Sequence, residues 1–275
     1  MNDYQARLTE RLAQYKSQHL PRVDDGAWHH RGTAHSYQHI LPKDNHRLNI
    51  LSGIRDPFWL WFESVRPSVS LHQFFHHLNS SQAMAFNLFF PFLTDGTVDK
   101  RLLKALGISD TADYSGCFEN VVHPEENTNF DFYMESSEGR RIFFELKLSE
   151  EGFGSCADDE RHQRKLREQY EPHLRRHVDE KWLEPKTFFA NYQVMRNLSY
   201  LGRYPDSGVV FIFPKANERL RESEQTIKHV ASNSLAPRVA IFYLENLVAR
   251  ILEAVADDEP LHLHYLAFRD KYICI

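Results

Sequence analysis

The 275-residue sequence lacks several signatures that would assign it to a common enzyme class. It contains no glycine-rich phosphate-binding loop, no nucleophile elbow and no CxxC pair, so P-loop, α/β-hydrolase and dithiol redox functions have no support. Cysteine is scarce, and Cys117, Cys156 and Cys274 lie far apart and follow neither disulfide nor zinc spacing. No internal repeat is visible.

Long apolar runs and a positive net charge are also missing. No uncharged apolar run approaches about 18 residues and no apolar signal core opens the chain, so the sequence predicts no membrane partner and a cytoplasmic location. The formal net charge is −5 at pH 7, so any contact with nucleic acid would need a local basic patch. The hydrophobic content of 42% is typical of a folded protein, and 275 residues suffice for a large domain with an extension.

The stretch from Asn129 to Leu148 has the pattern of a β-hairpin. Apolar side chains recur with the period of two that marks half-buried strands, at Phe130, Phe132, Met134, Ile142, Phe144, Leu146 and Leu148. Between the two strands, Ser137-Glu138-Gly139 has the composition of a three-residue loop that ends on a glycine in the left-handed region. This loop predicts the register of the strands.

The predicted register places an acidic patch on one face of the hairpin. With Ser136 opposite Arg140, Asp131 falls opposite Glu145, and the Cβ atoms of such a pair lie roughly 4.5–5.5 Å apart on one face. Lys147 lies two residues beyond Glu145 and shares that face. The carboxylates would repel each other unless a cation lay between them, and hard oxygen ligands without nearby Cys or paired His favour Mg²⁺ or Mn²⁺ over zinc.

Asp131 is followed after 13 intervening residues by Glu145-Leu146-Lys147, and this arrangement resembles the catalytic signature of the PD-(D/E)XK nuclease superfamily. Phe130 occupies the position of the usual proline, which is often missing among relatives. The resemblance implies a restriction-endonuclease-like fold and a metal ion held by Asp131, Glu145 and the backbone carbonyl of Leu146. It also implies that Lys147 orients and activates the attacking water.

Two upstream segments resemble an uncharacterised bacterial family of restriction-endonuclease-like proteins: His39-Ile40-Leu41-Pro42, and the predicted buried helix that begins with Ser80-Ser81-Gln82-Ala83. In many nucleases of this fold the helix before the core strands carries a polar group that reaches the metal or its water. The resemblance therefore adds Gln82 to the predicted catalytic residues. The alternative is that Gln82 caps the first turn of its own helix.

Two more polar residues could support the site. Gly116 to His123 predicts the strand before the hairpin, from which Glu119 would either lean towards the carboxylates as a third acid or face solvent. Helical periodicity resumes after Asn191, and in the superfamily the helix after the Glu-x-Lys strand often supplies a Gln or Lys beside the active site. Gln193 is the matching residue here.

Basic side chains are concentrated between Ser155 and Glu184, among several acids. One interpretation is a solvated helical excursion. The other is a basic strip along a DNA backbone, for which Arg161, Arg164 and Lys165 are the predicted DNA-binding residues.

Residues 1–69 predict an N-terminal extension that begins with an amphipathic helix over residues 3–20. Little periodicity follows between Arg22 and Asn49, which predicts irregular structure. No Cys or carboxylate recurs there at ligand spacing, so a metal cluster is not expected from its five histidines, His29, His30, His35, His39 and His46. His72 and His76 are expected as ordinary histidines on a helix, and residues 98–107 predict a short helix that ends at Gly107.

The sequence thus predicts an α/β protein, with a three-layer restriction-endonuclease-like core over residues 70–275 in which helices flank a central mixed β-sheet. The predicted function is Mg²⁺- or Mn²⁺-dependent hydrolysis of DNA phosphodiester bonds. The alternative is a catalytically inactive module that keeps the fold and binds nucleic acid or protein. Since duplex cleavage commonly needs two active sites, a homodimer is the expected assembly.

Overall fold

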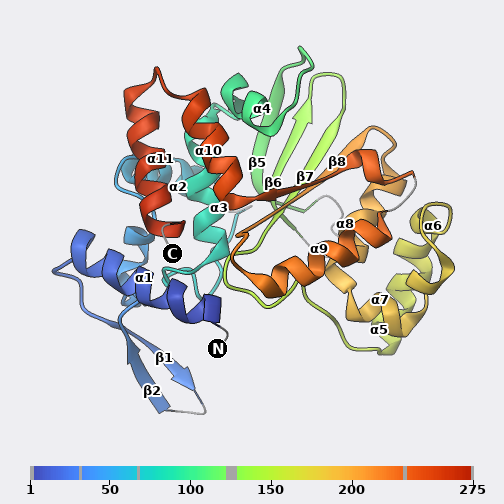
Figure 1. The fold of residues 1–275 in the computed structure, drawn as a ribbon, viewed down its shortest axis with the longest axis horizontal. Coiled ribbons are helices and arrows are strands. Elements are labelled where there is room, and N and C mark those ends of the chain that lie inside the picture. The colour runs from blue at the N-terminus through green and yellow to red at the C-terminus, as the bar shows by residue number, and fades with distance from the viewer. Residues whose placement is uncertain (1–2, 31–32, 67–68, 122–128, 232–233, 274–275) are drawn as a thin grey trace.

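The computed structural model describes residues 3–30, 33–66, 69–121, 129–231 and 234–273. A mixed sheet in the order β3-β4-β5-β6-β7-β8-β9 forms its centre (Figure 1). Neighbouring strands are antiparallel from β3 to β7 and parallel from β7 to β9. The strand bounds are β3 Leu93–Thr94, β4 Thr97–Val98, β5 Tyr114–Asn120, β6 Phe130–Ser136, β7 Arg141–Leu146, β8 Ser207–Phe213 and β9 Val239–Tyr243.

Helices cover both faces of this sheet, and each face buries its own apolar core. The first core lies under α1 Asp3–His19, α2 Arg55–Val65, α3 Ser81–Phe89, α4 Lys100–Leu106, α10 Leu244–Ala254 and α11 Glu259–Tyr272. The second core lies under a π-helix Leu166–Tyr170, α6 Glu171–Leu174, α7 Pro185–Ala190, α8 Tyr192–Arg203 and α9 Glu218–Val230. The helix α5 Glu160–Lys165, which has no buried residue, leads into this π-helix. Short 3₁₀ helices span Lys43–Asn49, Phe90–Phe92, Glu180–Trp182 and Ala236–Arg238. The predicted three-layer α/β architecture is therefore confirmed.

The central hairpin forms in the predicted register from its loop to the pair Phe132 with Phe144, and the predicted pair of Asp131 with Glu145 is not part of the ladder. The amide of Ser136 donates to the carbonyl of Arg140 at 2.8 Å, and Gly139 has φ 85°, which is the left-handed conformation that the loop requires. Tyr133 pairs with Phe143 as expected. The prediction of half-buried strands is wrong, because most side chains on both faces of the hairpin are buried under helices. Phe132 and Met134 pack in the first core, whereas Phe130 packs in the second and so does not share their face as predicted.

The segment from residue 22 to residue 49 is not irregular as predicted. It contains a two-stranded antiparallel ribbon, β1 Gly26–His30 with β2 Thr33–Tyr37, and the 3₁₀ helix Lys43–Asn49. The ribbon extends away from the body of the molecule in Figure 1, and the described side chains of β2 are largely exposed. Because neither face of the ribbon is buried in a core, its sequence has no period-two apolar pattern that would predict strands.

Other local predictions can be compared directly with the structure. Ser80 caps α3 by accepting a hydrogen bond from the Ala83 amide, and Gly107 ends α4 with φ 75°, as expected. The predicted strand from Gly116 to His123 corresponds to β5, although Val122 and His123 lie outside the described residues, as does Cys274. The helix predicted for His72 and His76 is absent, because residues 71–79 form turns that bond to the segment after the ribbon.

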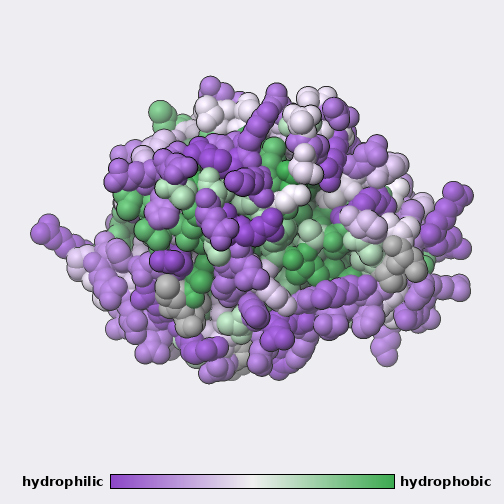
Figure 2. Space-filling model, turned by 45° about the horizontal axis from the view of Figure 1, so that its top comes forward, coloured by the Kyte–Doolittle hydropathy of each residue, from purple (hydrophilic) through white to green (hydrophobic). Residues whose placement is uncertain are grey.

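The N-terminal segment shares a core with the rest of the chain. Tyr4, Leu8 and Leu12 of α1 are buried in the same apolar cluster as Tyr265 and Phe268 of α11. Among the described residues, no helix is long and apolar enough to cross a membrane. Figure 2 shows a surface on which hydrophilic residues predominate, with smaller hydrophobic areas between them.

Candidate active site

Asp131, Glu145 and Lys147 meet where β6 begins and β7 ends. The ladder pairs of the hairpin stop at Phe132 with Phe144, and the Asp131 carboxylate Oδ2 accepts a hydrogen bond from the Leu146 amide at 2.6 Å. Lys147 Nζ donates to Glu145 Oε1 at 2.8 Å. The residues of the signature thus form one connected group, linked partly by a side chain to backbone contact that strand pairing alone does not predict.

Glu145 is the most enclosed member of this group, with 2% of its surface exposed. Its Oε1 accepts hydrogen bonds from Lys147 and from Gln193 Nε2, and its Oε2 accepts from Asn197 Nδ2 at 3.0 Å and Arg196 Nη2 at 3.4 Å. Two of these donors are cations, so the buried carboxylate is compensated both by charge and by hydrogen bonds. Its position is therefore held by both β7 and α8.

Asp131 and Glu119 carry negative charge that is less well compensated. Burial raises the pKa of the Asp131 carboxyl well above its usual range, and the charges of Glu145 and Glu119 raise it further. Burial also raises the pKa of Glu119 to about 7, against the effect of its hydrogen bond from Gln82. Glu119 has φ 51°, an uncommon conformation for a residue other than glycine. The backbone of β5 therefore departs from regular strand geometry at Glu119.

Lys147 lies among several acids. Burial of its side chain opposes the charged form, but the Glu145, Glu150 and Asp131 carboxylates outweigh burial, and the pKa of Lys147 is raised. Glu150 Oε2 also accepts a hydrogen bond from the Leu148 amide at 2.6 Å. The lysine is therefore held as an ammonium ion in the site.

Gln82 connects the start of α3 to the acidic group. Its Nε2 donates to Glu119 Oε1 at 2.8 Å and to the Ser70 carbonyl at 2.9 Å, while its Oε1 accepts from the His72 amide at 2.8 Å. The alternative that Gln82 caps its own helix is wrong, because Ser80 performs that function. Glu119 likewise faces the acidic group rather than solvent.

A cavity of about 500 Å³ opens beside these residues. Gln82, Glu119, Asp131, Lys147 and Glu150 line one side of it, and His72, Phe74 and His77 are also in its wall. Cavities of this size can hold a small ligand or part of a larger one. Glu119, Asp131, Glu150 and Lys147 are therefore accessible to a substrate, whereas Glu145 does not line the cavity.

The donor chemistry of the site fits a hard divalent cation. Asp131 and Glu119 line the cavity, and burial together with the charges of neighbouring acids raises their pKa values, so a bound cation would stabilise the ionised carboxylates. Among the described residues, no three His, Cys, Asp or Glu side chains gather as a metal-binding group. Mg²⁺ commonly takes only one or two carboxylates and fills its remaining positions with waters and substrate phosphates, so two carboxylates and a backbone carbonyl suffice.

The structure brings some predicted residues together and leaves others elsewhere. Gln193 donates to Glu145, and Gln82 donates to Glu119, which lines the same cavity as Asp131 and Lys147. The predicted DNA-binding residues Arg161, Arg164 and Lys165 lie instead on α5, which precedes the π-helix Leu166–Tyr170, and they do not line the cavity.

Sequence reasoning missed Glu150, Arg196 and Asn197. Arg196 and Asn197 lie three and four positions after Gln193, which places all three on one face of α8. That helical spacing was the available signal. Glu150 had no comparable pattern, because it follows the strand in a segment without regular structure.

One comparison with known proteins supports this fold. No curated protein and no solved structure shows significant similarity to the chain. One family model, described as restriction endonuclease associating with ARP, matches residues 9–273 and therefore nearly the whole chain. The chain belongs to this restriction-endonuclease-like family, and its fold is that of a nuclease-type domain.

Proposed function

We propose that this protein is a metal-dependent endonuclease that hydrolyses DNA phosphodiester bonds with Mg²⁺ or Mn²⁺. The observation that supports this proposal best is the connected group of Asp131, Glu145 and Lys147 beside an open cavity. Two acids and a lysine in this arrangement suit phosphoryl chemistry, in which catalysis depends on positioning and on stabilising negative charge. Membership in the family supports the same reaction class.

Asp131, Glu145 and the carbonyl of Leu146 would hold the ion. When bound, a divalent cation supplies polarisation of the phosphate and a lower pKa for an attacking water. Glu145 already accepts four hydrogen bonds. To bind the ion as well, its Oε1 atom would coordinate the ion beside the hydrogen bond from Lys147 or from Gln193. Gln193 and Asn197 keep that carboxylate oriented towards the end of β7.

Lys147 has the role of an electrostatic and positioning group. Its ammonium ion is kept charged by the neighbouring acids, lines the cavity and donates to Glu145. It can donate a second hydrogen bond to the attacking water or to a phosphate oxygen, on which charge increases during the reaction. Gln82 acts indirectly, because it holds Glu119 against the site.

The DNA backbone would be bound partly through α5. Arg161 and Arg164 are exposed there, and Lys165 is half-buried. Since the protein is acidic overall, such a local basic segment is the place where phosphate contacts are expected. Cleavage of both strands of a duplex would favour a homodimer with two active sites.

A cleavage assay tests the proposal. The purified protein is incubated with plasmid, linear and branched DNA in Mg²⁺, Mn²⁺ or EDTA, together with Asp131→Asn and Lys147→Ala. We expect metal-dependent cleavage by the parent protein and none by either variant. Glu135→Gln is the matched control, because Glu135 lies on the same strand but pairs with Arg141 at the opposite end of the hairpin. Metal-dependent cleavage by both site variants would remove these residues from the mechanism.

One observation favours the alternative of an inactive binding module. The Glu145 carboxylate is already occupied by four donors, as in a purely structural buried ion pair. Calorimetric titration with Mn²⁺ separates the two functions, because a catalytic site should bind the ion and Asp131→Asn should weaken that binding. An absence of binding by the parent protein, together with an absence of cleavage, would support the inactive module.

A further inference from the structure

A series of aromatic and imidazole rings connects the β1–β2 ribbon with the candidate active site. We call it the aromatic strip, and it consists of Trp28, Tyr37, His72, Phe74 and His77. Trp28 is 42% exposed and Phe74 is 36% exposed, and their ring centroids lie 6.5 Å apart. The ring centroids of Trp28 and Tyr37 lie 6.4 Å apart. The centroid of Phe74 lies 5.4 Å from that of His72 and 5.0 Å from that of His77. The rings are therefore continuous from the ribbon to the turn before α3.

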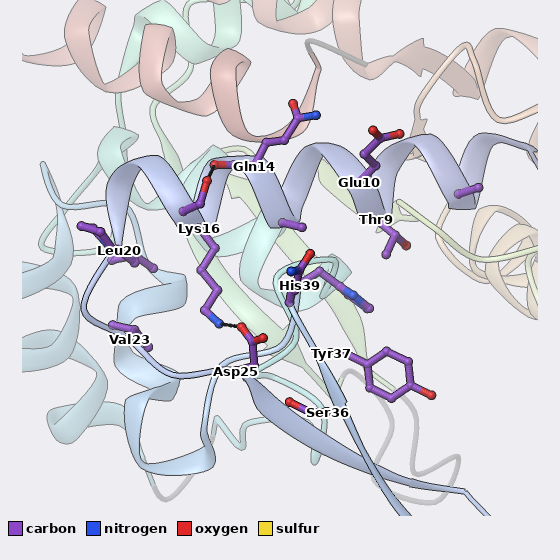
Figure 3. Close-up of a pocket in the computed structure, with 15 residues that line it drawn as sticks. Thr9, Glu10, Gln14, Lys16, Leu20, Val23, Asp25, Ser36, Tyr37 and His39 are labelled. Carbon is purple, nitrogen blue, oxygen red and sulfur yellow. Dashed lines mark hydrogen bonds and ion pairs between the residues drawn. The ribbon is translucent and has the colours of Figure 1, made fainter.

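The ribbon is fixed to this turn by main-chain hydrogen bonds. The Leu41 amide donates to the His76 carbonyl at 3.0 Å, and the Leu78 amide donates to the His39 carbonyl at 3.1 Å. On the other side, Lys16 of α1 pairs with Asp25 just before β1, as Figure 3 shows. Because both sides of its base are held, the ribbon presents Trp28 and Tyr37 at a defined position relative to the cavity.

The strip continues into the wall of the candidate active site. His72, Phe74 and His77 line the same cavity as Asp131 and Lys147. Among the described residues, His77 Nε2 has no hydrogen-bond partner although the atom is buried. Burial and the neighbouring histidines lower the pKa of His77 to about 4, so its ring is neutral at pH 7. A ligand that extends out of the cavity would therefore meet the uncharged rings of Phe74 and His77.

The strip lacks the charges that bind phosphates. The described residues 26–30, 33–42 and 69–77 contain no Lys, Arg, Asp or Glu. Binding of a DNA duplex depends mainly on cationic contacts with the backbone, whereas unpaired bases gain most from stacking on aromatic faces. The composition of the strip therefore suits bases rather than phosphates.

We propose that the aromatic strip binds unpaired bases of a DNA substrate next to the phosphodiester that is cleaved. The inference rests on the proposed function and narrows its substrate to DNA with a single-stranded segment beside the cleavage point. Lys147 and the exposed arginines of α5 would contact phosphates. The aromatic strip would hold the adjoining nucleobases by stacking. Stacking tolerates any base, so the strip would select for unpaired structure rather than for sequence.

Binding measurements in EDTA, which prevents cleavage, test this inference. Fluorescence anisotropy compares a labelled oligothymidylate, a blunt duplex of equal length and the same duplex with a single-stranded overhang. Trp28→Ala and Phe74→Ala should each weaken binding of the oligothymidylate about 5- to 100-fold, with less than about twofold change for the blunt duplex. Trp28→Phe should retain most of the affinity. Leu263→Ala is the control, since Leu263 is 56% exposed on α11 and outside the strip.

The outcomes separate this inference from the proposed function. Unchanged binding of the oligothymidylate by both alanine variants would overturn the inference, as would equal losses on the oligothymidylate and the blunt duplex. If Trp28→Ala lost single-strand binding while Lys147→Ala still cleaved DNA, the strip would stand and the proposed catalytic residues would not. Melting temperatures equal to that of the parent protein show that the variants are folded.

Discussion

Two buried lysines in this protein are held in opposite ways. Lys147 lies among Glu145, Glu150 and Asp131, whose charges raise its pKa despite burial. Lys271 on α11 has no exposed surface and donates to the Asn49 carbonyl at 2.7 Å and to Asn49 Oδ1 at 2.6 Å. Burial lowers its pKa well below the usual range, and nearby Arg55 adds to that effect.

The comparison shows that burial alone does not decide the charge of a lysine. Acidic neighbours keep Lys147 charged for chemistry, whereas burial and the charge of Arg55 favour the uncharged amine of Lys271. The α11 region repeats this pattern at His264, whose Nε2 donates to the Asn87 carbonyl at 2.8 Å. Burial lowers the pKa of His264 to about 4.

The largest expected difference comes from one substitution made at both lysines. Lys147→Met should reduce DNA cleavage by about 100- to 1,000-fold or more, because a positioned donor to the developing charge is lost. Lys271→Met should leave cleavage per folded molecule unchanged. Initial rates of plasmid nicking, normalised to folded protein, make the comparison, and equal losses for both variants would abolish the distinction.

Acidification should destabilise the folded protein, because buried His264 resists protonation. The unfolded chain binds a proton at His264 near pH 6.5, whereas the folded protein does so only near pH 4. Between these values the unfolded state holds more protons, so the stabilising contribution is complete above pH 6.5 and is lost as the pH falls to 4. The loss is at most about 3 kcal/mol. Urea unfolding from pH 7 to pH 4 should show a shallower decline for His264→Gln, and parallel curves would contradict the shift.

Removal of the Lys271 amine should destabilise the fold. In Lys271→Met the buried Asn49 Oδ1 loses a donor, which costs about 1–3 kcal/mol and lowers the melting temperature. The parent protein should also gain stability as the pH rises towards 10.5, since the unfolded lysine stays protonated up to that pH and the folded lysine does not. Urea unfolding between pH 7 and pH 10 checks both expectations. If the free energy of unfolding of the parent protein fell between pH 7 and pH 10 by more than that of Lys271→Met, Lys271 would be charged in the folded protein.

The smallest expected effect concerns the orientation of Glu145. Gln193→Ala removes one of four donors to the carboxylate and should reduce cleavage about tenfold, as changes in supporting hydrogen bonds around metal ligands often do. Thermal stability should change little because Gln193 is partly exposed. Measured rates over a range of Mn²⁺ concentrations would show whether the loss lies in ion binding or in turnover.

The hairpin could be predicted because its information is local. The loop at Ser137-Glu138-Gly139 sets the register, and the register brings Asp131 towards Glu145 and Lys147. The three-layer fold followed from the order of apolar strands and amphipathic helices. The ribbon could not be predicted in this way, since its exposed strands lack an apolar period and its base is held by turns that begin more than 30 residues later in the chain.

The contacts of the site were less accessible to sequence reasoning. Arg196 and Asn197 reach Glu145 only because α8 packs across the end of β7, about 50 residues along the chain. The Asp131 carboxylate turns to the Leu146 amide where the ladder pairing stops, and strand pairing rules do not describe that contact. The spacing of His72 and His76 suggested a helix, but the backbone there bonds to residues 39–41 instead.

By itself the sequence determined which residue types reach the end of the hairpin, because turn length and strand periodicity act over a few residues. Only the tertiary structure decided how those groups are ionised and which partners they share. Ionisation depends on the water and charges removed or supplied by distant segments, and these become neighbours only when the two layers of helices close over the sheet. For that reason Lys147 and Lys271, which are identical as sequence letters, differ in charge and in use.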